Sequence, residues 1–207
     1  MRDETRAKRQ AQIEAAAYAV LEDKGYAGTS MLAIARKARA SNETLYNWYG
    51  DKTGLFRALV QRNAAEVTAL LSDRIADGDD AAATLARVGP VLLGLVTSDR
   101  AVALNRAAAA DPGGDLGRTI AAEGRNAVAP LIGAVLEKGR ARGELAFDDT
   151  GAALETYLGL LIGDLQIRRV VGRMPAPDAD AMRARSARAL SQFLALYAPD
   201  SDTEKTT

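Results

Sequence analysis

Polar side chains that can read DNA bases gather in one short stretch, residues 41–48. This stretch carries two asparagine amides, three hydroxyls, one carboxylate and one indole. Leu45 and Tyr49 stand four residues apart, so they can anchor a helix of about two turns against a protein interior. The remaining side chains would then face outward. A short helix that exposes amides and hydroxyls is suited to contacts with base edges in the major groove of DNA.

A second short helix must hold this reading helix in place. Just before it, Ile34, Ala35 and Ala38 recur at i, i+1 and i+4 and predict a helix with one buried stripe. Thr29 is expected to cap its N-terminus through a side-chain oxygen. Arg39 and Ala40 leave room only for a tight turn before Ser41, which is again a good N-cap residue. The pattern predicts a helix-turn-helix.

The same stretch resembles the TetR family of one-component transcriptional regulators. The match runs without gaps from about Ile13 to Val60 and includes a Leu-Tyr pair followed by a lysine. The residues that carry it are Gly25-Tyr26, Thr29, Ile34-Ala35, Ala38, Ser41, Thr44-Leu45-Tyr46, Tyr49, Lys52 and Leu55-Phe56. Arg39 departs from the family pattern, which usually has glycine in the turn. A left-handed conformation there costs a non-glycine residue about 1 kcal/mol.

The resemblance and the side-chain chemistry together give a predicted DNA interface. Arg39, Tyr46 and Lys52 would hold phosphates, while Asn42, Asn47, Thr44 and Trp48 would meet bases. Lys52 could instead be a solvated surface residue, and Tyr46 could be a packed aromatic ring with its hydroxyl at the surface. The full predicted set is Thr29, Arg39, Ser41, Asn42, Glu43, Thr44, Tyr46, Asn47, Trp48 and Lys52.

The distribution of charge agrees with a nucleic-acid partner although the net charge is zero. Residues 1–62 contain 11 Lys and Arg against 7 Asp and Glu, so the N-terminal part is net basic and the remainder is net acidic. Ordinary scatter could produce the same asymmetry. Four of the basic residues, Arg2, Arg6, Lys8 and Arg9, stand at the start of the first predicted helix, residues 5–24. They could face a phosphate backbone or simply be solvated.

The chain as a whole is predicted to be all-α, with about nine helices, because apolar stripes of helical period recur throughout and strand-like alternation does not. Breaks in the pattern predict a helix-turn-helix DNA-binding domain over residues 1–54 and a connecting helix over 55–76. A ligand-binding and dimerisation domain over 77–200 and a tail over 201–207 follow. The chain contains no His and no Cys, which removes the commonest general base and thiol chemistry. We therefore expect no enzyme, no cofactor and no metal site.

The later helices are expected at roughly 80–97, 99–110, 115–141, 149–172 and 178–198. Pro90 and Pro130 fall inside periodic stretches, where each would kink a helix or else mark a helix start. Kinked helices can leave a cavity in a bundle. An effector would be largely apolar, because few buried-type polar residues occur there. The candidate pocket residues are Leu85, Val88, Leu92, Leu95, Leu104, Ile120, Val128, Leu131 and Tyr157, although apolar residues at helical spacing are usually core.

The last two predicted helices are apolar over more than one face, which suggests burial against their own domain and against a second copy. A single chain could also bury both faces. In the resembling family these helices pair across a two-fold axis. The predicted interface residues are Leu154, Leu158, Leu161, Leu165, Met182, Ala189, Phe193 and Leu196.

The resulting hypothesis is a homodimeric, ligand-responsive transcriptional regulator, and more specifically a repressor that a small, largely apolar effector releases from a palindromic operator. Its partners would be double-stranded operator DNA, a second copy and the effector. No apolar run reaches the roughly 18 residues of a membrane span, and no signal peptide is recognisable, so a cytoplasmic location is expected. Two alternatives remain: a constitutive or architectural DNA-binding protein without an effector, and a helical protein-interaction module.

Overall fold

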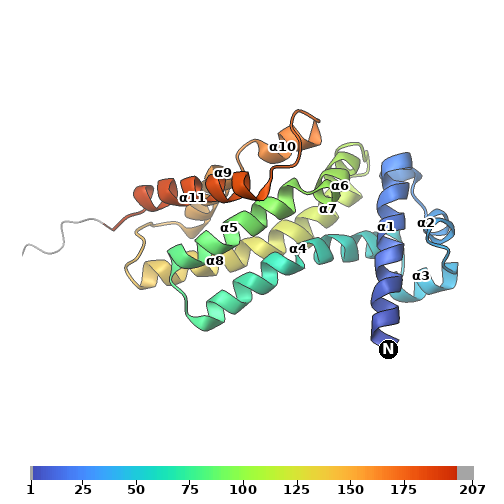
Figure 1. Ribbon diagram of the computed structural model, residues 1–207, viewed down its shortest axis with the longest axis horizontal. Helices are drawn as coiled ribbons and strands as arrows, with labels where there is room; N and C mark the ends of the chain where they lie inside the picture. Colours follow the sequence, from blue (N-terminus) through green and yellow to red (C-terminus); the bar gives the residue numbers. More distant parts are fainter. Residues whose placement is uncertain (1, 200–207) are drawn as a thin grey trace, which may run out of the picture. The chain divides into compact units, whose positions relative to one another are not determined.

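The computed structural model describes residues 2–199, except for the side chains of residues 2, 3 and 5, and this part of the chain is all-helical as predicted (Figure 1). The predicted tail over 201–207 and the side chain of Arg2 therefore lie outside the described residues. The elements in chain order are α1 (Arg2–Gly28), α2 (Met31–Ala38), α3 (Asn42–Tyr49), α4 (Lys52–Asp77), α5 (Ala81–Thr97), α6 (Asp99–Ala109), α7 (Asp115–Ile120), the π-helical turn η1 (Ala121–Arg125), α8 (Asn126–Ala141), α9 (Thr150–Ile162), α10 (Leu165–Val170) and α11 (Ala179–Leu196).

The chain forms two compact units that do not follow chain order. The first unit contains the residues up to Asn63 together with Asp99–Arg125, and the second contains Ala64–Ser98 and the described residues from Asn126 onward. Helix α4 contributes its first half to one unit and its second half to the other. Helices α6, α7 and the turn η1 thus pack with the N-terminal helices, whereas the predicted domains follow one another along the chain.

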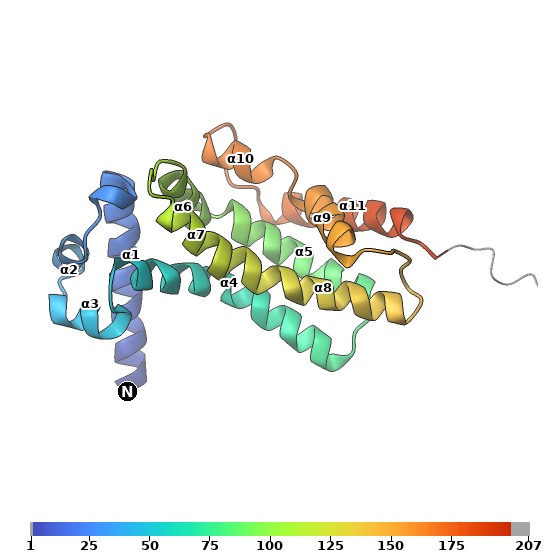
Figure 2. The ribbon, with the colours of Figure 1, turned by 180° about the vertical axis from the view of Figure 1, so that it is seen from behind.

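The core of the first unit joins α1 to the helices that follow it. Ile13, Leu21, Ile34 and Leu45 are almost fully buried there, together with Leu55 and Phe56 at the start of α4. Helix α6 adds Leu104, and α7 adds Leu116. Figures 1 and 2 agree in placing α2 and α3 on the same side of α1. Apolar residues from four separate stretches therefore fix the position of the two short helices.

The first unit also buries polar groups, and two pairs of them join α1 to α4. Nε of Arg62 lies 2.9 Å from Oε1 of Glu14, whose side chain is almost inaccessible to solvent. Asn63 donates to the hydroxyl of Tyr18 at 2.8 Å. Burial raises the pKa of the Glu14 carboxyl, and the neighbouring Arg62 and Arg100 guanidinium groups oppose that rise. These contacts tie α4 to α1 near the point where α4 leaves the unit.

The second unit is built on an apolar core with aromatic rings at its centre. Phe193 of α11 packs edge-on against Tyr157 of α9 and lies 4.8 Å, between ring centroids, from Tyr197. Gly89 lets α11 approach α5 closely, because a Cβ at this position would lie 2.0 Å from Oγ of Ser186. Burial strongly raises the pKa of the Tyr157 hydroxyl. Helices α5, α9 and α11 therefore meet in one tightly packed layer.

The structure interrupts two of the predicted helices and shows whether the two prolines mark helix starts. The helix expected over 115–141 is interrupted by η1, in which the bonding pattern widens by one residue. The helix expected over 149–172 breaks at Gly163, whose φ of 51° ends α9 before α10 begins. Pro90 and Pro130 lie inside α5 and α8, so neither proline marks a helix start.

No single helix among the described residues is both long and apolar enough to cross a membrane, and only α5 and α6, taken together as a bent pair, pass the same criteria of length and composition.

Candidate nucleic-acid interface

Helices α2 and α3 form the predicted helix-turn-helix, and each begins with a serine cap. Oγ of Ser30 accepts the backbone N–H of Ala33 at 3.2 Å. Oγ of Ser41 accepts the backbone N–H of Thr44 at 3.0 Å. Each cap satisfies one of the free N–H groups at a helix start, which typically contributes about 1 kcal/mol. The two helices are thus locally defined by their own sequences.

Thr29 does not cap α2, and that part of the prediction is wrong. Its hydroxyl donates to the carbonyl of Gly25 at 2.7 Å, and its side chain is buried. Gly25 has a φ of 65° and breaks the helical path inside α1, as the sequence indicated. The break sets Thr29 one position too early to act as the N-cap, so Ser30 takes that role. The buried Thr29 side chain therefore fixes the chain between the Gly25 break and the start of α2.

Arg39 holds the turn between the two helices in the left-handed conformation, with φ of 53° and ψ of 39°. It is the one non-glycine residue with positive φ among the described residues. Arg9 of α1 supports the turn, because its guanidinium donates to the carbonyl of Arg39 at 2.7 Å and to that of Ala38 at 3.3 Å. These bonds offset part of the local strain. The Arg39 side chain itself is exposed.

Helix α3 is anchored by Leu45, which is fully buried, and presents most of its other residues to solvent. The exposed positions are Ser41, Asn42, Glu43, Tyr46 and Asn47, and Thr44 is half-buried with its hydroxyl 2.7 Å from that of Ser41. Tyr46 is 49% exposed. The two asparagine amides have the donor and acceptor pair that matches an adenine edge. The outward face of α3 is therefore polar and accessible, as the sequence predicted.

Trp48 lies differently from its predicted outward position. It is half-buried and packs against the core of the first unit, next to Tyr49. The guanidinium of Arg6 stands 5.5 Å from the centre of its ring, a cation–π contact. The hydroxyl of Tyr49 is buried without a partner, and burial raises its pKa. Because the Trp48 indole contacts both the core and Arg6, it fixes the end of α3 and is poorly placed to contact a base.

Lys52 is held by Tyr26 rather than standing free at the start of α4. Its ammonium donates to the Tyr26 carbonyl at 3.0 Å and lies 4.1 Å from the centre of the Tyr26 ring. Asp51 caps α4 as predicted, because its carboxylate accepts the N–H of Gly54 at 2.7 Å. Lys52 therefore joins α4 to the end of α1, and two of its three ammonium hydrogens remain for another acceptor.

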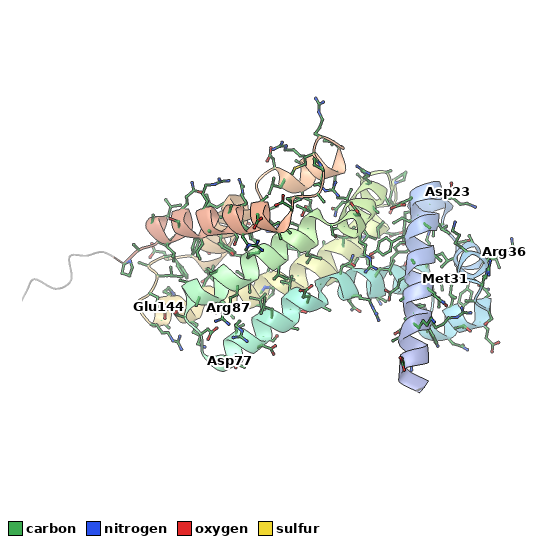
Figure 3. All side chains as sticks on the ribbon, in the orientation of Figure 1. Asp23, Met31, Arg36, Asp77, Arg87 and Glu144 are labelled. Carbon is green, nitrogen blue, oxygen red and sulfur yellow. The ribbon has the colours of Figure 1, made fainter. Side chains whose placement is uncertain are left out.

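Two exposed cations beside the turn escaped the sequence prediction. Arg36 and Lys37 occupy the last turn of α2, next to Arg39. Figure 3 shows Arg36 pointing away from α1 on the outer side of α2. The signal was present in the sequence, since cations are favoured at helix C-termini and three of the four residues 36–39, just before the reading helix, are basic. The interface thus combines a polar helix with a basic edge.

Comparisons with known proteins agree with this geometry. Residues 13–59 match the family model of bacterial regulatory proteins of the tetR family, and residues 83–199 match the C-terminal domain of AefR-like transcriptional repressors. This chain belongs to the TetR family. The protein is therefore related to transcriptional regulators that carry a DNA-binding helix-turn-helix, a family whose members are generally not enzymes.

Solved structures of TetR-family regulators share the fold over nearly the whole chain. A regulator from Agrobacterium tumefaciens is 30% identical, covers 93% of this chain and 95% of its own, and has a TM-score of 0.72. The flavonoid-responsive regulator FrrA is 25% identical, covers 94% of this chain and 100% of its own, and has a TM-score of 0.68. No curated protein sequence matches this chain.

The predicted pocket residues fall into both compact units of this TetR-family chain. Leu104 and Ile120 belong to the core of the first unit. The other seven belong to the core of the second unit: Leu85, Val88, Leu92, Val128 and Tyr157 are buried, and Leu95 and Leu131 are half-buried. The C-terminal family model spans all of these seven. The nine predicted residues therefore do not form one continuous set.

The predicted dimer residues divide in a similar way. Leu161, Ala189 and Phe193 are buried in the core of their own unit, so the prediction that they face a second copy is wrong. Leu154, Leu158, Leu165 and Met182 are half-buried against the same core, and Leu196 is 64% exposed. Both helices carry a second, outward stripe that contains Gly159, Arg188 and Ser191. The predicted seam is mainly the inward face.

Proposed function

We propose that this TetR-family chain is a homodimeric repressor that binds a palindromic operator and releases it when a small, largely apolar effector binds. The observation that carries the proposal is the outward face of α3. Asn42, Tyr46 and Asn47 are exposed on a helix that is anchored by the buried Leu45 and, at its end, by the half-buried Trp48 and Tyr49. Exposed amides on a rigidly held short helix supply base-specific hydrogen bonds.

Phosphate contacts would come from the basic edge of the helix-turn-helix. Arg36, Lys37 and Arg39 are exposed within one turn of chain, and the hydroxyl of Tyr46 can reach a phosphate from α3. Such contacts set affinity and register, whereas the asparagines set sequence preference. Lys52 keeps its predicted phosphate role only through the hydrogens that Tyr26 leaves free. Thr29 and Trp48 take structural roles in this proposal.

Dimerisation would place two copies of α3 in successive major grooves, with half-sites about 34 Å apart. The outward stripe of α9 and α11 is the proposed contact with the second copy. It includes Gly159, where an added Cβ would meet open space, together with Arg188, Ser191 and Leu196. A glycine without neighbours on an exposed helix face permits close approach of another backbone.

The effector would bind in the second unit, where the seven predicted pocket residues make an almost wholly apolar environment. FrrA is flavonoid-responsive, and a flavonoid is a flat, mostly apolar molecule with a few hydroxyls. The family model of the C-terminal domain describes a repressor, which supports repression as the sign of regulation. A coupling of about 3 kcal/mol between effector and DNA would change operator affinity about 150-fold.

Selection of bound duplexes from a random pool tests the proposal directly. We expect a palindromic motif, and we expect Asn47→Ala to relax the preference at one base pair of each half-site. Arg36→Ala with Lys37→Ala should weaken binding to all duplexes and reduce its salt dependence. Arg87→Ala, which removes an exposed cation of the second unit, is the matched control and should change neither property.

Release is tested by adding the flavonoid naringenin to the selected complex. Dissociation at micromolar flavonoid supports an effector-released regulator. If the protein binds a palindrome and the flavonoid does not weaken that binding, the protein is either a constitutive DNA-binding protein or responds to another class of effector. Failure to enrich any sequence would show that α3 does not read DNA.

A further inference from the structure

One carboxylate in the π-helical turn η1 holds two residues of α4. Oε1 of Glu123 lies 3.1 Å from Nε of Arg57, and Oε2 accepts a hydrogen bond from the Gln61 amide at 2.7 Å. Arg57 and Gln61 are four residues apart, so Glu123 spans one full turn of α4. All three residues belong to the first compact unit.

The position of Glu123 in the chain makes this contact more than a surface ion pair. The turn η1 ends at Arg125, and the second unit resumes at Asn126, the first residue of α8. Helix α4 begins at Lys52, directly after the end of α3 at Tyr49 and the two residues that follow it. Glu123 thus lies within three residues of one unit boundary and contacts the helix that continues from the reading helix.

The turn that carries Glu123 is π-helical, with one more residue than an α-helical turn, and such turns are frequent at functional sites. The extra residue determines which way Glu123 points, because a displacement by one residue would rotate its side chain by about 100° and remove the carboxylate from Arg57 and Gln61. Val60 packs on the same turn, 3.5 Å from where a Cβ of Gly124 would stand, so the displaced turn would also lose contact with α4.

We propose that Glu123 is a positioning residue for operator binding, because it sets the place of α4 and hence of α3. This inference rests on the function proposed above. Charge attraction alone contributes little here, because Arg57 is 54% exposed and an exposed pair is typically worth less than about 1 kcal/mol. The contact therefore acts by geometry: it holds two residues one turn apart in the half of α4 that follows α3 in the chain.

A charge exchange separates this role from a structural or purely electrostatic one. Glu123→Arg adds two positive charges, which by general electrostatics should tighten DNA binding. The proposal predicts the opposite, a loss of about tenfold in operator affinity, because the repelled Arg57 displaces α4. Adding Arg57→Glu should restore affinity to within about threefold of the wild type. Asp180→Arg, which makes the same charge change at an exposed pair on α11, is the control and should not weaken binding.

Amide hydrogen exchange in the free protein provides a readout that needs no DNA. Exchange over residues 57–63 should be faster in Glu123→Arg and return to the wild-type rate in the exchanged pair, with melting temperatures nearly unchanged in all variants. Unchanged operator affinity and unchanged exchange in Glu123→Arg would overturn the inference, as would failure of Arg57→Glu to rescue either property. If the wild type selects no duplex, the proposed function fails, and the exchange data still decide whether Glu123 positions α4.

Discussion

The two compact units bury different kinds of polar group at their centres. The first unit holds an ion pair and a side-chain hydrogen bond: the Glu14 carboxylate meets Arg62, and the Tyr18 hydroxyl accepts from Asn63. At the centre of the second unit, the Tyr157 hydroxyl has one long hydrogen bond of 3.4 Å and Oγ of Ser186 has none. Each unit also has an exception, the unpaired Tyr49 hydroxyl in the first and the paired Thr97 hydroxyl in the second. Satisfied polar networks favour one fixed arrangement, whereas apolar packing tolerates several of similar energy. Under the proposed function, the fixed arrangement suits the unit that presents α3, and the tolerance suits the unit that would take an apolar effector.

The largest expected effect lies in the aromatic core of the second unit. Phe193→Asp removes a fully buried ring and buries a charge, which should cost about 5 kcal/mol or more. We expect loss of the thermal transition of this unit in circular dichroism rather than a folded monomer.

Leu196→Asp is the matched change on the outward side of the same helix. Its side chain is exposed, so stability should stay within about 0.5 kcal/mol, while sedimentation should show monomers. A folded Phe193→Asp protein that sediments as a monomer would instead place Phe193 in the dimer interface.

The second largest effect concerns the anchor of the reading helix. Leu45→Ala should cost about 3 kcal/mol and leave α3 without its one buried side chain. Specific DNA binding should be lost even at temperatures where the protein remains folded, as a gel shift with the selected duplex would measure. Tyr46→Phe removes one exposed hydroxyl on the same helix and should weaken binding to all sequences without a measurable change in stability. An equal loss of DNA binding in Leu45→Ala and Tyr46→Phe would contradict these separate roles of an anchor and a phosphate contact.

The third effect tests the paired core through pH. Arg62→Met leaves the Glu14 carboxylate buried without its closest cation and should cost about 2 kcal/mol at pH 7. Burial already raises the pKa of Glu14 above its unfolded value, and the loss of Arg62 should raise it further. The folded state then favours the protonated acid, so the deficit is largest above the raised pKa and shrinks as pH falls toward the unfolded value.

Urea unfolding of Arg62→Met at pH 5 and pH 7 would measure this difference. The exposed pair in Asp180→Ala is the control and should show little change at either pH. A deficit that grows as the pH falls would contradict the assigned role of Glu14.

The local parts of the first unit could be predicted from sequence because neighbours in the chain determine them. Serine caps, the Gly25 break and the left-handed Arg39 depend on a few adjacent residues. The error at Thr29 has the same origin: Thr29 and Ser30 are both capping residues, and only the exact path after Gly25 decides between them. Trp48 was misplaced because its partner, Arg6, is distant in sequence.

The second unit was harder to predict because an apolar stripe does not reveal what covers it. The stripe containing Leu161, Ala189 and Phe193 would look the same against its own core or against a second copy. The grouping of α6, α7 and η1 with the N-terminal helices likewise depends on contacts between residues far apart in the chain, such as that between Gln61 and Glu123. Hydrophobic periodicity predicts which residues are buried. The surface that covers them depends on contacts between residues far apart in the chain.

The smallest effect has the opposite sign and tests the loosely satisfied core. Ser186→Ala removes a buried hydroxyl that has no hydrogen-bond partner and should stabilise the protein by about 1 kcal/mol. Thr97→Val is the matched change at a buried hydroxyl that does donate, to the Leu93 carbonyl at 2.6 Å, and it should destabilise by a similar amount. Thermal unfolding of the two variants should therefore shift in opposite directions. If both variants lost stability, Ser186 would have to be paired in solution, and the contrast between the polar groups at the centres of the two units would fail.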